Sequence, residues 1–292
     1  MRNLLFNGSA TAIITPFKDG CIDYTALKTL IKHQIENGTD ALVVAGTTGE
    51  APTLKDDEHI ELIRFVVKEA RGNLPIIAGT GSNSTEHAVC MSKKAYSVGA
   101  NGLLSVTPYY NKCNDEGIIR HYEKIANATP LPVILYNVPS RTGYNLKTDS
   151  IKKLCKTKNI IAVKEASGDL AKAEEILSSC NVTVYSGNDD IIVPMMSAGA
   201  LGVISVISNL VPAEVKKLTD LCLKGDYQGA NKLQLKLFPL IKAIFKNVNP
   251  IGIKYAMSLM KMCEFDVRLP LCFPDKSCKA EIENEMKKLC LI

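Results

Sequence analysis

The chain has 292 residues, of which 46% are hydrophobic and 22% are charged, and its formal net charge is +5. This balance is typical of globular proteins, and the 6% aromatic content, without Trp and without Lys/Arg clusters, argues against a nucleic-acid groove. No apolar run approaches the roughly 18 residues of a membrane span, and the first one is too short for a secretory signal. We therefore expect a cytoplasmic protein that binds neither nucleic acid nor membranes.

Eight short apolar runs rich in Val and Ile alternate with longer amphipathic segments up to about residue 225. In chain order they cover residues 10–17, 41–46, 75–81, 102–108, 132–138, 160–167, 182–188 and 202–208. Near-continuous apolar runs are typical of parallel strands that are covered on both faces. Eight consecutive strand–helix units favour a closed barrel over an open doubly wound sheet. The sequence thus predicts an α/β fold, a (β/α)8 TIM barrel over residues 1–225.

The segments between the runs carry helical signals. Within residues 57–71, apolar side chains such as Ile60 and Ile63 recur at helical spacing, and residues 84–100 begin with a Ser/Thr cap and end at glycine. After residue 225 the alternation stops, and helices are predicted over 226–245, 250–263 and 279–290. We expect residues 226–292 to form a C-terminal helical extension packed on the barrel.

Several common cofactor and metal patterns are missing from the sequence. The ten cysteines form no CxxC pair, so we expect reduced thiols rather than a disulfide framework or a zinc site. The four histidines, all in predicted helices, lack ligand spacing. Neither a dinucleotide fingerprint nor a phosphate-binding loop is present. We therefore expect no cofactor and no metal, which disfavours a metal-dependent aldolase.

Lys164 stands inside the apolar run 160–167. Burial of an ammonium is unfavourable, and a desolvated lysine that is partly neutral can attack a carbonyl to form an imine. Side chains alternate along a strand, so Lys164 and Glu165 should point to opposite faces. From this segment alone, a structural lysine that extends to solvent or pairs with a carboxylate from another strand stays open.

Two further polar sites follow predicted strands. Tyr136 ends the strand before that of Lys164, where a phenol can transfer protons, and Arg141 follows in the loop, where a guanidinium suits a carboxylate. The turn GTTGE, residues 46–50, offers glycine flexibility and amide N–H groups for a carboxylate. Each has a structural alternative: a core tyrosine, a surface arginine and an ordinary turn.

These segments resemble the dihydrodipicolinate synthase family, within the superfamily of pyruvate-dependent Schiff-base aldolases. The resemblance runs from SATAIITPFKDGCID through GTTGE, VTPYYNK, YNVPSRTG, VKEASGD, SGND and GVISV to NPIGIKYA. It implies a lyase that condenses pyruvate with L-aspartate 4-semialdehyde to 4-hydroxy-tetrahydrodipicolinate, in lysine and diaminopimelate biosynthesis. It also implies a homo-oligomer, which we expect to be a homotetramer built as a dimer of dimers, although the sequence does not distinguish it from a dimer.

The resemblance implies a role for each matching residue. Lys164 corresponds to the Schiff-base lysine and Tyr136 to the general acid/base. The partners of Tyr136 in a proton relay correspond to Thr47 and Tyr110, the latter supplied by a neighbouring subunit. The residues that bind substrate correspond to Thr48 for the pyruvate carboxylate, Arg141 for the carboxylate of the semialdehyde, and Gly187 and Ile204 in the pocket wall, Ile204 through its carbonyl.

One region departs from family members that lysine inhibits. After GTTGE the chain has Ala51, Pro52 and Asp56 in place of a Ser-Ala pair and a histidine. His87 occupies the place of a glutamate that would bind the ammonium of lysine. His59, Asn83 and Tyr109 match the pattern. Because His87 removes that ion-pair partner, we predict weak or absent inhibition by lysine.

Two alternatives to the synthase are another lyase of the same superfamily and a barrel without catalytic activity. N-acetylneuraminate lyases and keto-deoxy sugar acid aldolases share the lysine and the tyrosine but act on polyhydroxylated chains. Arg141, in YNVPSRTG, favours a short charged semialdehyde instead. A barrel that has lost catalysis and only binds ligands is disfavoured because Lys164, Tyr136, the threonine pair and Arg141 are all present.

Overall fold

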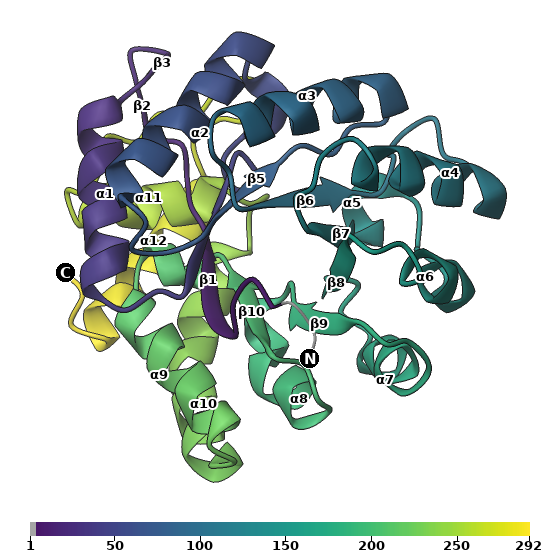
Figure 1. The fold of residues 1–292 in the computed structure, drawn as a ribbon. Coiled ribbons are helices and arrows are strands. Elements are labelled where there is room, and N and C mark those ends of the chain that lie inside the picture. Colours follow the sequence, from purple (N-terminus) through teal and green to yellow (C-terminus); the bar gives the residue numbers. More distant parts are fainter. Residues whose placement is uncertain (1–3) are drawn as a thin grey trace.

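The computed structural model describes residues 4–292, and its centre is a closed barrel of eight parallel strands (Figure 1). The strands are β1 (Gly8–Ala12), β4 (Ala41–Val44), β5 (Ile76–Gly79), β6 (Gly102–Val106), β7 (Val133–Asn137), β8 (Ile160–Glu165), β9 (Thr183–Ser186) and β10 (Gly202–Ser205). Each strand pairs with its neighbours in the chain, and β1 closes the barrel against β10. The predicted (β/α)8 barrel is confirmed.

Helices surround the strands, as Figure 1 shows. The outer ring consists of α1 (Tyr24–Glu36), α2 (Asp56–Ala70), α3 (Thr85–Ser97), α4 (Asp115–Ala126), α6 (Thr148–Leu154), α7 (Leu170–Ser179), α8 (Ile192–Ser197) and α9 (Pro212–Leu223). Short helical turns follow several strands: η1 (Ala51–Thr53), α5 (Pro139–Thr142), η2 (Asp189–Ile191) and η3 (Ile207–Asn209). They build the loops at the carboxyl ends of the strands, where barrel enzymes carry their active sites.

The first strand begins and ends earlier in the chain than the apolar run 10–17 predicts. β1 ends at Ala12, and a small hairpin, β2 (Phe17–Lys18) with β3 (Cys21–Ile22), follows. The amide of Ile14 donates to the Asn209 side chain at 3.1 Å instead of to a strand, and Pro16 has no amide hydrogen to donate. The apolar run therefore continues beyond the strand as a buried loop.

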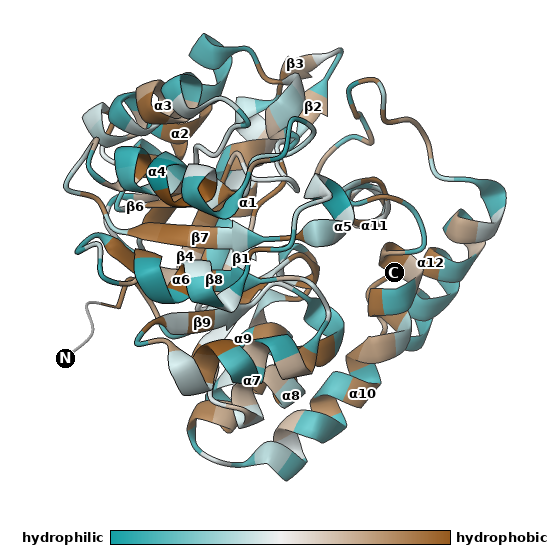
Figure 2. Cartoon of the chain, turned by 90° about the vertical axis from the view of Figure 1, so that its right-hand side faces the viewer, coloured by the Kyte–Doolittle hydropathy of each residue, from teal (hydrophilic) through white to brown (hydrophobic). Residues whose placement is uncertain are grey.

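Three helices without strands between them follow the barrel: α10 (Tyr227–Ile244), α11 (Ile251–Leu259) and α12 (Lys276–Lys288). α10 packs against α9 and α12, and α11 packs against α12. Figure 2 shows β7 running toward α5 and α11, so these helices lie on the side of the barrel where the strands end. Among residues 4–292, no helix has the length and apolar character needed to cross a membrane.

The interior of the barrel is filled unevenly. At one end, Phe6 stacks on Tyr185 with ring centroids 4.3 Å apart, and the Tyr185 hydroxyl donates to the Phe6 carbonyl at 2.7 Å. Toward the carboxyl ends of the strands, inward positions are occupied by small residues, including Ala12, Ala166 and Gly187. Small side chains leave a cavity there, whereas the opposite end is closed by aromatic rings.

Candidate active site

Lys164 lies on the inner face of β8 and is only 6% exposed. Ala162 and Ala166 share this inner face, whereas Val163 belongs to the outer core between strands and helices. β7 and β8 pair Tyr136 directly with Lys164, and the Lys164 Nζ atom lies 4.3 Å from the centre of the Tyr136 ring. The lysine therefore points into the barrel.

The two structural alternatives for this lysine do not match its surroundings. Its side chain is buried rather than extended to solvent, and no carboxylate of the described chain lies within 4 Å of its amine. Glu165 points to the opposite face, where it accepts hydrogen bonds from the Asn137 side chain and the Ser167 amide. An unpaired lysine at the end of a buried strand is available for chemistry.

A cavity of about 180 Å³ lies directly above Lys164. Its wall includes six of the eight residues predicted for the site: Thr47, Thr48, Tyr136, Arg141, Lys164 and Gly187. They come from the ends of four different strands and the loops that follow, as expected at the carboxyl face of a barrel. The rest of the wall consists mostly of small or apolar side chains, and it also includes Asn188, Phe245 and Asn249.

Gly187 follows β9 and packs tightly against β8. Its amide donates to the Glu165 carbonyl at 2.7 Å. A Cβ atom at this position would lie 2.5 Å from the Ala166 Cβ atom and 3.1 Å from the Lys164 Cε atom. Glycine is therefore required by close approach, because a Cβ atom would collide with Ala166 and crowd the Lys164 side chain.

The turn of residues 46–50 is tied to the C-terminal helices by Asn249. The Asn249 Nδ2 atom donates to the Thr48 Oγ1 atom at 3.0 Å, and the Asn249 carbonyl accepts from the Arg141 guanidinium at 3.1 Å. The sequence alone does not identify Asn249, because the segment NPIGIKYA does not reveal what it contacts in the folded barrel. The signal that was available is a short polar residue placed before Pro250, at the start of a predicted helix.

Two predicted residues lie outside this cavity. Tyr110, in the loop between β6 and α4, is 90% exposed and has a positive φ of 71°. Ile204 is fully buried on β10, where it pairs with Ala10 inside the barrel. The side chain of Tyr110 is thus exposed and does not line the cavity of its own chain.

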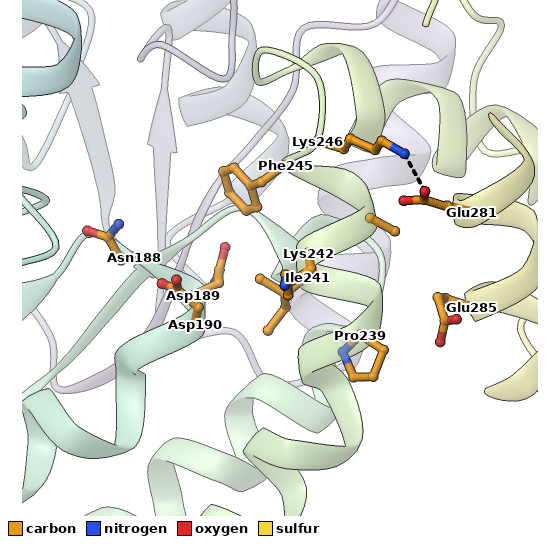
Figure 3. A pocket seen from close by; sticks show the side chains of 12 residues that line it. Asn188, Asp189, Asp190, Pro239, Ile241, Lys242, Phe245, Lys246, Glu281 and Glu285 are labelled. Atoms are coloured by element: carbon orange, nitrogen blue, oxygen red, sulfur yellow. Dashed lines mark hydrogen bonds and ion pairs between the residues drawn. The ribbon is translucent and has the colours of Figure 1, made fainter. Parts of the chain in front are cut away.

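A larger groove of about 710 Å³ adjoins the cavity (Figure 3). It runs between η2, α10 and α12, and shares Gly187, Asn188 and Phe245 with the cavity above Lys164. In Figure 3, Phe245 projects from the end of α10 toward the side that carries Asn188. The groove therefore connects the cavity to solvent past the Phe245 ring, which is 41% exposed.

A buried carboxyl supports the loop after β10. Burial raises the pKa of Asp189, while hydrogen bonds from Ser205 and from the amides of Val206 and Ile207 oppose this shift. The Asp189 Oδ2 atom accepts from these two amides at 2.9 and 3.1 Å. Because Val206 is part of the cavity wall, Asp189 fixes the shape of that wall.

A buried, unpaired lysine amine above a tyrosine ring, at the carboxyl end of a (β/α)8 barrel, defines an enzyme of the Schiff-base lyase class. The model of the dihydrodipicolinate synthetase family matches residues 5–289. The chain belongs to this family, which confirms the resemblance found in its motifs.

Individual relatives agree with this assignment. The chain is 50% identical over 269 residues to a 4-hydroxy-tetrahydrodipicolinate synthase of Caldicellulosiruptor bescii, covering 91% of both chains. It superimposes on the dihydrodipicolinate synthase of Aquifex aeolicus with a TM-score of 0.97 at 42% identity, covering 98% of this chain and 99% of that one. A monomeric dihydrodipicolinate synthase variant also has a TM-score of 0.97, at 39% identity, with 99% and 98% covered.

Proposed function

We propose that the chain is a 4-hydroxy-tetrahydrodipicolinate synthase, which condenses pyruvate with L-aspartate 4-semialdehyde through an imine on Lys164. The observation that carries this proposal is the Lys164 amine, buried at the cavity wall without a carboxylate partner and 4.3 Å from the centre of the Tyr136 ring. Family membership and close relatives of that name support the same reaction.

The reaction begins with the bond between lysine and pyruvate. The Lys164 amine attacks the ketone carbon of pyruvate, water leaves, and an imine forms. Loss of a proton from the methyl carbon gives an enamine, which attacks the aldehyde carbon of the second substrate. The amine of that substrate then attacks the imine carbon, releases Lys164 and closes the six-membered ring. No cofactor is needed, because the lysine supplies the covalent activation.

Neighbouring residues take the proton and carboxylate roles in this scheme. The Tyr136 hydroxyl transfers protons beside the reacting carbon. The hydroxyl of Thr48 donates to the pyruvate carboxylate: its oxygen already accepts from Asn249, so its hydrogen is left for the substrate. Arg141 binds the carboxylate of the semialdehyde. Gly187 lines the pocket, whereas Ile204, which is not part of the cavity wall, is proposed to contribute through its main-chain carbonyl.

Tyr110 is proposed to act in a second subunit, in a relay with Thr47 and Tyr136. Its 90% exposure and its absence from the cavity wall of its own chain suit this role. The proposal therefore includes a homo-oligomer, with a homotetramer as the expected form.

The cytoplasm is the proposed location. The exposed cysteines Cys21, Cys90 and Cys272 carry free thiols, which suits a reducing compartment.

The test is intact-mass measurement after borohydride treatment with pyruvate, followed by peptide mapping and turnover assays. We expect a single reduced pyruvate adduct on Lys164, its loss in Lys164→Ala, and its retention in Lys147→Ala, a matched change at an exposed lysine. Adduct with turnover of aspartate semialdehyde supports the synthase. Adduct without that turnover, but with cleavage of N-acetylneuraminate, moves the function to the sugar-acid lyases. Absence of an adduct refutes the Schiff-base mechanism.

A further inference from the structure

An ion pair between Lys254 and Glu50 is buried where α11 meets the turn of residues 46–50. The Lys254 Nζ atom lies 2.6 Å from the Glu50 Oε1 atom, and the two side chains are 0% and 1% exposed. The second oxygen of Glu50 accepts from the Arg268 amide at 3.0 Å, and Lys254 Nζ lies 4.2 Å from the centre of the Phe17 ring. The pair thus joins residues that are 204 positions apart.

A contribution to the stability of the fold does not by itself explain why this pair is buried. Removing two charges from water is unfavourable, and apolar side chains of the same volume often stabilise a core as well or better. Burial lowers the pKa of Lys254, although Glu50 opposes the shift. What the pair adds is a fixed position, since separating two buried charges is strongly unfavourable.

The two segments held by this pair also form the substrate cavity. Glu50 ends the turn that carries Thr48, two residues earlier. Lys254 lies in the first turn of α11, where its amide donates to the Pro250 carbonyl at 3.0 Å. Asn249 directly precedes this helix and contacts Thr48 with its side chain and Arg141 with its carbonyl. A shift of α11 against the turn would move both contacts together.

We propose that Lys254 is a positioning residue for both substrate sites: by pairing with Glu50 it places Asn249, and through Asn249 it sets the Thr48 hydroxyl and the Arg141 guanidinium. This inference rests on the proposed function, in which Thr48 binds the pyruvate carboxylate and Arg141 that of the semialdehyde. Lys254 itself touches neither substrate, because it does not line the cavity.

The test is the double variant Glu50→Gln/Lys254→Met, which removes both charges and nearly conserves volume. We expect KM to rise for pyruvate and for aspartate semialdehyde, each about tenfold, as for one lost hydrogen bond to a charged group. The yield of borohydride-trapped adduct at saturating pyruvate should stay complete, because Lys164 is unchanged. Should this variant fail to fold, Glu50→Gln alone, which keeps one acceptor for Lys254, is measured with the same expected direction.

The matched control is Lys18→Met/Glu264→Gln. This pair also joins the barrel to the C-terminal segment at 2.6 Å, but its side chains are 55% and 58% exposed. We expect both KM values of this control to equal those of the wild type. Unchanged KM values in the Glu50 variants, or a rise for one substrate only, overturn the shared positioning role whatever happens to the melting temperature.

The two proposals fail in different ways. If the wild-type chain does not turn the substrates over, the proposed function fails. The pyruvate concentration that half-saturates adduct formation then still tests whether Lys254 positions Thr48.

Discussion

The close approach at Gly187 leads to a sharp prediction for the substitution Gly187→Ala. The added Cβ atom would lie 2.5 Å from the Ala166 Cβ atom and 3.1 Å from both the Glu165 carbonyl oxygen and the Lys164 Cε atom. Carbon atoms pack at about 3.5–4.0 Å, so the end of β9 and Ala166 must separate by about 1 Å, and the Lys164 Cε atom must move by a few tenths of an ångström. The backbone cannot simply retreat, because the Gly187 amide is bonded to the Glu165 carbonyl.

Ala166 lies two residues after Lys164, so a shift there disturbs the position of the reacting lysine. Misplacement of a reacting group by about 1 Å lowers rates by roughly 100-fold, while overpacking of this kind destabilises a fold by about 1–3 kcal/mol. We therefore expect Gly187→Ala to fold with a lower melting temperature and to form the pyruvate imine more slowly, by up to about 100-fold.

The assay is the time course of borohydride-trapped adduct on Lys164, followed by intact mass. The second substitution Ala166→Gly removes the nearest contact of the new methyl group, and Gly187→Ala/Ala166→Gly should therefore recover most of the lost rate. Wild-type trapping by Gly187→Ala would refute the reasoning, because the methyl group would then fit without moving the lysine.

Three further outcomes are expected. The substitution Tyr136→Phe keeps the ring beside Lys164 but removes the hydroxyl. The pyruvate adduct should therefore still form, while kcat falls about 10²–10³-fold. A kcat equal to that of the wild type would contradict the proton-transfer role. Burial lowers the pKa of His121 from 6.5 to about 4, so the unfolded chain binds more protons between these values and stability falls as pH drops through this window. In urea titrations, His121→Gln should remove about 2–3 kcal/mol of the stability difference between pH 7 and pH 4.5, and an unchanged difference would contradict this. The His87 Nε2 atom is already paired with Asp56 at 3.0 Å, so we expect inhibition of turnover by lysine to be weak or absent. Inhibition at micromolar lysine would contradict this.

The barrel and the pairing of Tyr136 with Lys164 were predictable because both follow from local pattern. Each apolar run marks one strand, and consecutive strands of a barrel are neighbours, so polar residues at their ends must meet. The bounds of the first strand were not predictable in this way. Residues 13–17 are as apolar as the strand itself, and the contact that ends the strand comes from Asn209, almost 200 positions later.

For a related reason, the sequence alone does not show the roles of Asn249, Phe245 and Lys254. They belong to the helical segment that follows the barrel, Lys254 in α11 and the other two in the turn before it. The spacing of apolar residues on a helix shows which face is buried but not against what. A lysine in the apolar segment NPIGIKYA is the same signal that identified Lys164. Without the position of α11, however, neither its partner Glu50 nor the contact of Asn249 with Thr48 can be inferred.

These contacts also bear on whether the C-terminal helices form a separable unit. A segment that merely covered the barrel would bury apolar surface and leave the polar groups at the strand ends satisfied without it. Here Glu50 is buried with both oxygens bonded to groups from this segment, one to Lys254 and one to the Arg268 amide. Removing residues 226–292 would leave that carboxylate without these partners and Thr48 without Asn249. The barrel and its extension therefore complete one site, and the boundary near residue 225 separates two patterns of secondary structure rather than two functions.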